Sequence, residues 1–286
     1  MKKTFLIALA ATALAAPAFA DHHSMSKAEH DKMHKAHTER LAKILADPSR
    51  GADAKRDQYR HPAETFEFFR LHPDHVIGEY APGGEWVSRI LGRYVNEKGK
   101  YTGLYFGTKS YFSDQQKTGI AAGIAKFPAD VAAVSGRPAT DFNAFSLSEI
   151  PDGAKGSFDR IIVMRMLHNM MNWNIADAEI KAMRDLLKDD GLLGIEQHRA
   201  KADAPFSYTD GTKGYMREAD IIKFMEVNGF ELVAKSEINA NPKDSANWPD
   251  GVWTLPPALR LKDVDRAKYE AIGESDRMTL LFKKRP

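Results

Sequence analysis

The stretch that decides the fold runs from residue 75 to residue 94 and reads HVIGEYAPGGEWVSRILGRY. Its first part, 75–81, is mostly apolar and β-forming, which predicts a buried strand. The glycines of Pro82-Gly83-Gly84 predict a sharp turn. Apolar residues at helical spacing from Trp86 to Tyr94 predict a helix after the turn. A strand that enters a helix through a glycine turn is a unit of an α/β fold.

The same alternation continues along the chain. Further β-like runs occupy 101–106, 141–146, 158–164, 192–197, 230–238 and 278–283. Helical patterns occupy 113–127, 176–188 and 217–228. This alternation predicts a Rossmann-like α/β fold, a mostly parallel sheet of seven strands with helices on both faces. Two long polar insertions, near 199–216 and 239–274, are either binding loops or surface decoration.

Residues 1–20 have the pattern of a secretory signal peptide. A basic start at Lys2-Lys3 precedes an apolar run from Phe5 to Ala16, and Ala18-Phe19-Ala20 matches the small-x-small cleavage pattern. The run is shorter than the roughly 20 residues that span a bilayer, so a retained membrane anchor is the less favoured alternative. We expect cleavage after Ala20 and a periplasmic or secreted protein with no membrane anchor.

The composition beyond residue 20 narrows the classes of partner. Removal of Lys2 and Lys3 reduces the 41 basic residues to the number of the 39 acidic residues, so the remaining chain is formally neutral. A neutral chain has no global electrostatic field that would attract nucleic acid. The absence of cysteine excludes disulfides and thiolate chemistry. We expect a polar arm or linker over 21–50, a globular domain over 51–286, and a small molecule as the partner.

The arm over 21–50 is rich in histidine and has two interpretations. After cleavage the chain would begin Asp21-His22-His23, and a free amine, two backbone amides and a third-position imidazole suit square-planar Cu(II) or Ni(II). A second set shares one helical face: His30, His34 and His37. The arm is therefore either a metal-binding segment that uses these histidines or a solvated polar helix.

Three candidate functional residues lie at predicted strand ends. Glu79 ends the first strand before the glycine turn, where the free N–H groups of the next helix favour a nucleotide. His168 follows the fourth strand and His198 ends the fifth, and histidine suits a general base because its ordinary pKa is near neutrality. The structural alternatives are that Glu79 accepts turn N–H groups and that the histidines pack in the core.

The insertions contribute further candidates. Arg199 would hold a carboxylate or phosphate, or pair with a loop acid. Tyr215, Trp248 and Trp253 would stack on a flat ligand or anchor their own loops.

Several motifs together resemble a known family. Glu79-x-x-Pro-Gly-Gly-x-Trp86 and Leu167-His168-Asn169 are similar to class I S-adenosylmethionine-dependent methyltransferases, and more narrowly to a group of exported bacterial predicted methyltransferases. Further similar segments occur at 56–64, 196–199, 214–218, 236–242, 251–257 and 272–277. The resemblance implies strand order 3-2-1-4-5-7-6 with an antiparallel seventh strand.

The same resemblance implies methyl transfer from S-adenosylmethionine to a small molecule, with His168 or His198 as the base. The cofactor-binding positions that it implies are Glu79, Ala81, Pro82, Gly83, Gly84, Trp86, Phe106 and Asn169. Ala81 and Glu85 stand where the family has glycine, and the second strand ends at Phe106 without the family's ribose-binding acid. The alternatives are a non-catalytic periplasmic ligand-binding protein of this fold, and a Cu- or Ni-binding protein that uses the arm.

Overall fold

The computed structural model describes residues 27–83, 86–109 and 111–286, with side chains from residue 32 onward. The predicted signal peptide, His22, His23, the His30 side chain, Gly84 and Glu85 lie outside this description. The chain divides into two units, 1–36 and 37–286, and the sheet belongs to the second. Within the described ranges, no helix is both long enough and apolar enough to cross a membrane.

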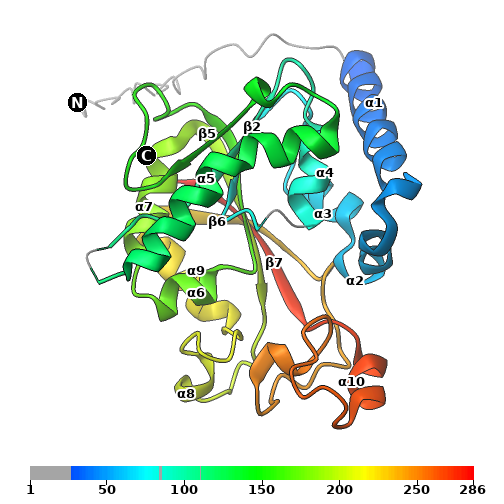
Figure 1. Ribbon diagram of the computed structural model, residues 1–286, viewed down its shortest axis with the longest axis vertical. Coiled ribbons are helices and arrows are strands. Elements are labelled where there is room, and N and C mark those ends of the chain that lie inside the picture. The colour runs from blue at the N-terminus through cyan, green and yellow to red at the C-terminus, as the bar shows by residue number, and fades with distance from the viewer. Residues whose placement is uncertain (1–26, 84–85, 110) are drawn as a thin grey trace, which may run out of the picture. The chain divides into compact units, whose positions relative to one another are not determined.

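Seven strands form one sheet in the second unit (Figure 1). They are β1 (Val76–Tyr80), β2 (Lys100–Tyr105), β3 (Phe142–Ser146), β4 (Phe158–Met164), β5 (Leu187–His198), β6 (Phe230–Ser236) and β7 (Arg277–Lys284). Their order is β3-β2-β1-β4-β5-β7-β6. Strand β7 runs antiparallel to β5 and β6, and the other neighbours pair in parallel. The predicted fold class and strand order are confirmed.

Helices and short 3-10 turns connect the strands. The helices are α1 (Lys27–Leu45), α2 (Asp57–Arg60), α3 (Pro62–Phe68), α4 (Trp86–Tyr94), α5 (Asp114–Ser135), α6 (Leu167–Asn172), α7 (Ala176–Leu186), α8 (Phe206–Thr209), α9 (Glu218–Val227) and α10 (Arg266–Ile272). The 3-10 turns are η1 (Pro48–Arg56), η2 (Ala139–Asp141) and η3 (Gly251–Thr254).

Helix α5 is longer than its sequence pattern predicts. The pattern ends the helix at Phe127, but the helix continues through Pro128 to Ser135. A proline inside a helix removes one backbone hydrogen bond. Burial of Phe127 and Val131, each 3% exposed, opposes that cost.

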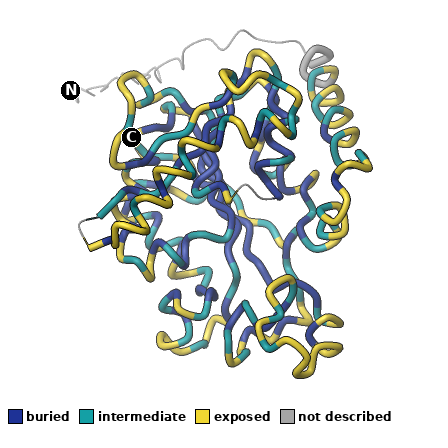
Figure 2. The backbone as a smooth tube through the Cα atoms, in the orientation of Figure 1, coloured by how far each residue is buried: buried dark blue, intermediate teal, exposed yellow. Residues whose placement is uncertain are grey.

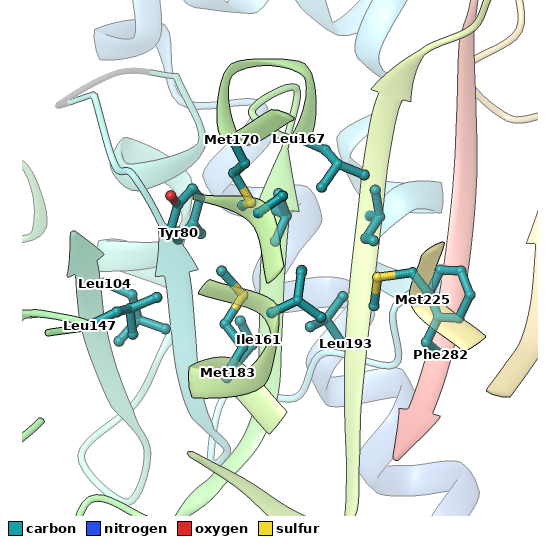
Figure 3. Packing of buried hydrophobic residues seen from close by; sticks show 14 of the residues in the cluster. Tyr80, Leu104, Leu147, Ile161, Leu167, Met170, Met183, Leu193, Met225 and Phe282 are labelled. Atoms are coloured by element: carbon teal, nitrogen blue, oxygen red, sulfur yellow. The ribbon is translucent and has the colours of Figure 1, made fainter. Parts of the chain in front are cut away.

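Apolar layers cover both faces of the sheet, and the strands between them are the most buried part of the backbone (Figure 2). One layer includes Ile161 on β4, Met183 on α7 and Phe282 on β7 (Figure 3). The other lies under α3 and α4, and Leu41 of α1 joins it. The Arg40 side chain donates to the Tyr94 carbonyl at 2.7 Å, so the end of the polar segment 21–50 packs on the globular unit.

Candidate functional site

The sheet order creates a crevice at the carboxyl end of β1. Strand β1 lies between β2 and β4, and the chain continues from β1 to β2 and β3 on one side before it returns to β4 on the other. In open α/β sheets, ligands bind outside the carboxyl ends of the strands at such a reversal. The β1–α4 turn and the residues that follow β2 and β4 therefore define the candidate site.

The β1–α4 turn begins with a residue in the left-handed conformation. Ala81 has a φ of 50°, and its N–H donates to the Leu104 carbonyl at 2.7 Å. A residue with a Cβ atom pays roughly 1–2 kcal/mol for this conformation, which glycine adopts freely. The backbone at this position therefore has a conformation that suits glycine, the residue that the resemblance to class I methyltransferases implies here.

An apolar cleft of about 500 Å³ opens beside the turn. Ala81, Pro82, Gly83 and Phe106, all predicted to bind the cofactor, lie on its wall. The rest of the wall consists of Tyr105, Phe112, Gln116, Gly119, Ile120, Met166 and Trp173. The Phe106 ring lies 5.2 Å from the Trp173 ring, centroid to centroid. Aromatic rings around an apolar cleft favour a flat, weakly polar ligand group.

Glu79 is buried beneath the turn, between α4 and β2. Its Oε2 accepts hydrogen bonds from Ser88 Oγ at 2.8 Å and from the Tyr101 hydroxyl. Burial raises the pKa of Glu79 to about 7, although the two hydroxyl donors and Arg165 oppose that shift. Near neutral pH this carboxyl group is therefore divided between its charged and protonated forms.

A second buried carboxyl group reaches the end of β2 from another helix. Glu179 on α7 accepts a hydrogen bond from the Gly107 N–H at 3.0 Å. Burial raises the pKa of Glu179 to about 7. The sequence correctly shows no acid directly after β2, but α7 places one beside the same segment. Amphipathic spacing did not single out Glu179, because position 179 belongs to the buried face of its helix.

His168 and His198, predicted as candidate bases, lie together at the ends of β4 and β5. Their ring centroids are 5.6 Å apart, and the Trp253 ring lies 5.9 Å from His168. Burial lowers the pKa of His168 to about 4 and the pKa of His198 well below its ordinary value. Both imidazoles are therefore neutral at physiological pH.

Gln197 contacts the His168 ring through both ends of its amide group. Gln197 Nε2 donates to the Gly214 carbonyl at 2.8 Å and lies 3.1 Å from His168 Nδ1, and Gln197 Oε1 lies 3.4 Å from the same ring nitrogen. The shorter contact favours the tautomer in which Nδ1 accepts and the ring carries its proton on Nε2. This arrangement favours His168 as a hydrogen-bond donor toward a ligand. His198 Nδ1 lies 2.6 Å from Ser275 Oγ.

Besides Glu79, two more predicted cofactor residues lie away from the cleft wall. The Trp86 side chain is 1% exposed, donates to the Asp53 carbonyl at 3.2 Å and carries the Arg60 guanidinium 5.1 Å above its ring. Asn169 on α6 donates to Met166 Sδ at 3.4 Å. Trp86 therefore contacts Asp53 and Arg60 instead of lining the cleft. Asn169 is linked to the cleft only through its contact with Met166.

The aromatic and charged candidates of the insertions are partly structural. Asp244 accepts hydrogen bonds from the Tyr215 hydroxyl at 2.8 Å and from Trp248 Nε1 at 2.7 Å. Arg199 pairs with carboxylates at 218, 237 and 276. These contacts join the two insertions to each other and to the segment before β7. Trp253 and Tyr215 both lie beside the histidine pair, with ring centroids 5.9 Å from His168 and 6.3 Å from His198, respectively.

The histidines of the arm do not form a metal centre in the described part of the chain. No group of three His, Cys, Asp or Glu residues among the described side chains could hold a metal ion. The His37 ring instead meets His72 edge-on at 4.8 Å between centroids.

Sequence reasoning missed Arg165, which follows β4 directly. Its φ is 57°, its N–H donates to the Glu196 carbonyl at 2.7 Å, and its Nη1 donates to Glu196 Oε1 at 3.0 Å. Strained backbone in a residue other than glycine is concentrated at functional sites. The available signal was a charged residue at the end of a strand beside the switch point.

No protein-family model and no curated protein matches the sequence. Among solved structures, the 4+2 cyclase SpnF has a TM-score of 0.52 at 18% identity, over 90% of this chain and 96% of that chain. The MccD protein has a TM-score of 0.51 at 8% identity, over 78% and 95%. A SAM-dependent methyltransferase from Aquifex aeolicus has a TM-score of 0.48 at 13% identity, over 85% and 97%. The strand order with an antiparallel β7 is the order that the resemblance to class I methyltransferases implies, and the architecture is that fold.

Proposed function

We propose that this chain is an S-adenosylmethionine-dependent methyltransferase that acts on a small molecule. The observation that carries the proposal is the apolar cleft of about 500 Å³ at the switch point of a class I methyltransferase fold. The β1–α4 turn and the end of β2 wall this cleft, which is where such a sheet binds its ligand.

The residues of the cleft fit the flat part of the cofactor. Phe106, Trp173 and Ile120 offer the apolar faces that a purine ring requires. Pro82 and Gly83 leave the backbone of the turn open to close approach. When bound, S-adenosylmethionine supplies an electrophilic methyl group on a sulfonium.

The chain's own contribution is positioning. The neutral rings of His168 and His198, with Trp253 beside them, would orient the methyl acceptor at the ends of β4 and β5. Because a histidine with a pKa near 4 is a weak base, the acceptor must already be nucleophilic at neutral pH. Correct alignment of donor and acceptor then accelerates the transfer.

Calorimetry with S-adenosylmethionine and S-adenosylhomocysteine tests the proposal directly. Gly119 lies on the cleft wall and a Cβ atom there meets no atom within 4 Å, so the ring of G119F has room to enter the cleft. We expect affinity to fall about tenfold or more. The matched control is G119A, which leaves the cleft open and stabilises α5 by roughly 0.5–1 kcal/mol. Absence of binding to the parent at millimolar concentration, or equal binding to G119F, would contradict the proposal.

We also propose that the chain is exported and cleaved after Ala20. The basic start, the apolar run and the small-x-small site of residues 1–20 support this. Mass spectrometry of protein recovered from the periplasm should find Asp21 at the amino terminus. Comparison of the periplasmic preparation with protein recovered from the cytoplasm then shows in which compartment the protein retains a bound cofactor. An intact Met1 in all fractions would reject the export proposal.

A further inference from the structure

A connected ion-pair network lies at the carboxyl ends of β4 and β5 and the amino end of the antiparallel β7. Glu196 on β5 pairs with Arg165 at 3.0 Å and with Arg277 at 3.3 Å. Glu274 pairs with Arg277 at 2.9 Å, with Arg60 at 2.8 Å and with Arg56 at 3.0 Å. The network therefore joins four arginines to two glutamates, and it extends from the segment before β1 to the second insertion.

This network has an excess of positive charge. The nearby acids of the N-terminal segment are engaged elsewhere, since Asp53 pairs with Arg89 and Asp57 pairs with Arg50. Glu79 feels the charge of Arg165 but hydrogen-bonds to hydroxyl groups. A buried charge needs a counter-charge because desolvation is costly.

The buried part of the network also contains polar atoms that the protein leaves unsatisfied. The side chains of Arg277 and Glu196 are 1% and 0% exposed. Within the described residues, Arg277 Nε reaches only Glu196 Oε1, in the ion pair at 3.3 Å, and Glu196 Oε2 has no hydrogen-bond partner. An unpartnered carboxylate oxygen calls for a donor, so these two atoms do not themselves indicate an anion. The excess of arginines over acids in the network is the observation that points to one.

Arg165 is the member of this network that reaches the site. Its side chain is 18% exposed, and only its Nη1 donates to a described residue. Its charge is felt by both site histidines, whose pKa values it helps to lower. The remaining guanidinium donors thus lie in a region where the neighbouring imidazoles are neutral and the net charge is positive.

We propose that the methyl acceptor is an anion, a carboxylate or a similar oxyanion, and that Arg165 binds its charged group beside His168 and His198. The role of the bound anion as methyl acceptor rests on the proposed function, whereas the anion site itself rests on the arginine-rich ion-pair network. Guanidinium binds planar oxyanions through paired donors. The Nε2–H of His168 supplies a neutral donor beside them. Another source of the same chemistry is the carboxylate of the cofactor itself.

Benzoate and the neutral benzamide are the probes, titrated into the full chain by calorimetry at low salt, with and without saturating S-adenosylhomocysteine. We expect benzoate to bind about tenfold more tightly than benzamide. R165Q should weaken benzoate by about tenfold, and R165K by less. R199Q is the matched control, because Arg199 lies on the same edge but is already paired with three carboxylates. It should leave benzoate affinity unchanged.

Each outcome decides between the alternatives. Equal binding of benzoate and benzamide to the parent overturns the anion site, and this comparison needs no substitution if R165Q fails to fold. Loss of S-adenosylhomocysteine affinity in R165Q overturns it in favour of the cofactor's carboxylate. If the parent binds benzoate through Arg165 but does not bind S-adenosylhomocysteine, the methyl-transfer proposal fails and the anion site stands.

Discussion

The polar groups around the β1–α4 turn are held differently from those in the second insertion. Beside the turn, the buried Tyr80 hydroxyl and Glu179 Oε2 interact with each other but form no well-aligned hydrogen bond in the described ranges, and Glu79 has a raised pKa. In the insertion, Asp244 is 0% exposed and accepts four hydrogen bonds. The turn region therefore has poorly satisfied buried polar groups. In the insertion Asp244 is fully bonded, although the buried Thr254 Oγ1 has no partner among the described residues.

This contrast distinguishes a ligand site at the β1–α4 turn from a structural frame around Asp244 in the second insertion. Unmet polar groups cost free energy, and they persist where a ligand or a reaction uses them. Fully bonded buried polar groups instead fix one conformation. We therefore expect substitutions in the insertion to lower stability, and substitutions at the turn to leave stability equal or higher while they change binding.

The largest effect is expected for D244A. The substitution leaves four buried donors without their acceptor: the Tyr215 hydroxyl, Trp248 Nε1 and the N–H groups of Ala246 and Asp276. We expect the free energy of unfolding to fall by about 3–4 kcal/mol. Urea denaturation measures it. The control D263A changes an exposed aspartate nearby and should stay within about 0.5 kcal/mol. A small loss in D244A would remove the distinction between frame and site.

The next-largest effect depends on pH and has the opposite sign, because the substitution is expected to raise the free energy of unfolding. The pKa of Glu79 is about 7 in the folded protein against an ordinary value of 4.5. The folded state then binds a proton that the unfolded state has lost, so this group's contribution to stability falls as pH rises from 4.5 to 7. E79Q mimics the protonated form and should exceed the parent by on the order of 2 kcal/mol at pH 8, with little difference at pH 4.5.

The difference between E79Q and the parent is the quantity to measure. Burial lowers the pKa of His75 and of His168 to about 4. Those groups lose stabilisation as pH falls from 6.5 toward 4, which opposes the slope of Glu79 in the parent's own profile. The control E149Q changes an exposed glutamate. A difference for E79Q that does not vary with pH would show that the Glu79 carboxyl is not held protonated.

A pair of tyrosine substitutions compares the two regions directly. Y215F removes a hydroxyl that donates to Asp244 at 2.8 Å, and we expect a loss of about 1.5 kcal/mol. Y80F removes a buried hydroxyl that interacts with Glu179 but forms no well-aligned hydrogen bond among the described residues. We expect a change within about 0.5 kcal/mol. Thermal unfolding of both variants measures the difference, and equal losses would contradict the contrast.

The sequence predicts the fold better than it predicts the site. The spacing of apolar residues and the positions of the glycines suffice to predict seven strands, because each strand buries its own apolar face. The resemblance supplies the strand order and places Pro82, Gly83 and Phe106 at the cleft. Glu179 and Arg165 escape prediction because their roles depend on which elements pack together. The neutral state of His168 depends on burial and on Gln197, which spacing does not reveal.

The smallest expected effect is at Ala81, where the backbone itself carries the strain. A81G removes the roughly 1–2 kcal/mol cost of a left-handed alanine and adds the chain entropy of glycine, roughly 0.4–1 kcal/mol. We therefore expect a net gain of about 0.5–1 kcal/mol in urea denaturation, although A81G removes a side chain. A122G, at an exposed alanine inside α5, is the matched control and should lose about 1 kcal/mol. A loss in A81G as large as in A122G would mean that the turn does not impose its conformation on Ala81. The strain at the mouth of the cleft would then have to lie in other residues of the turn.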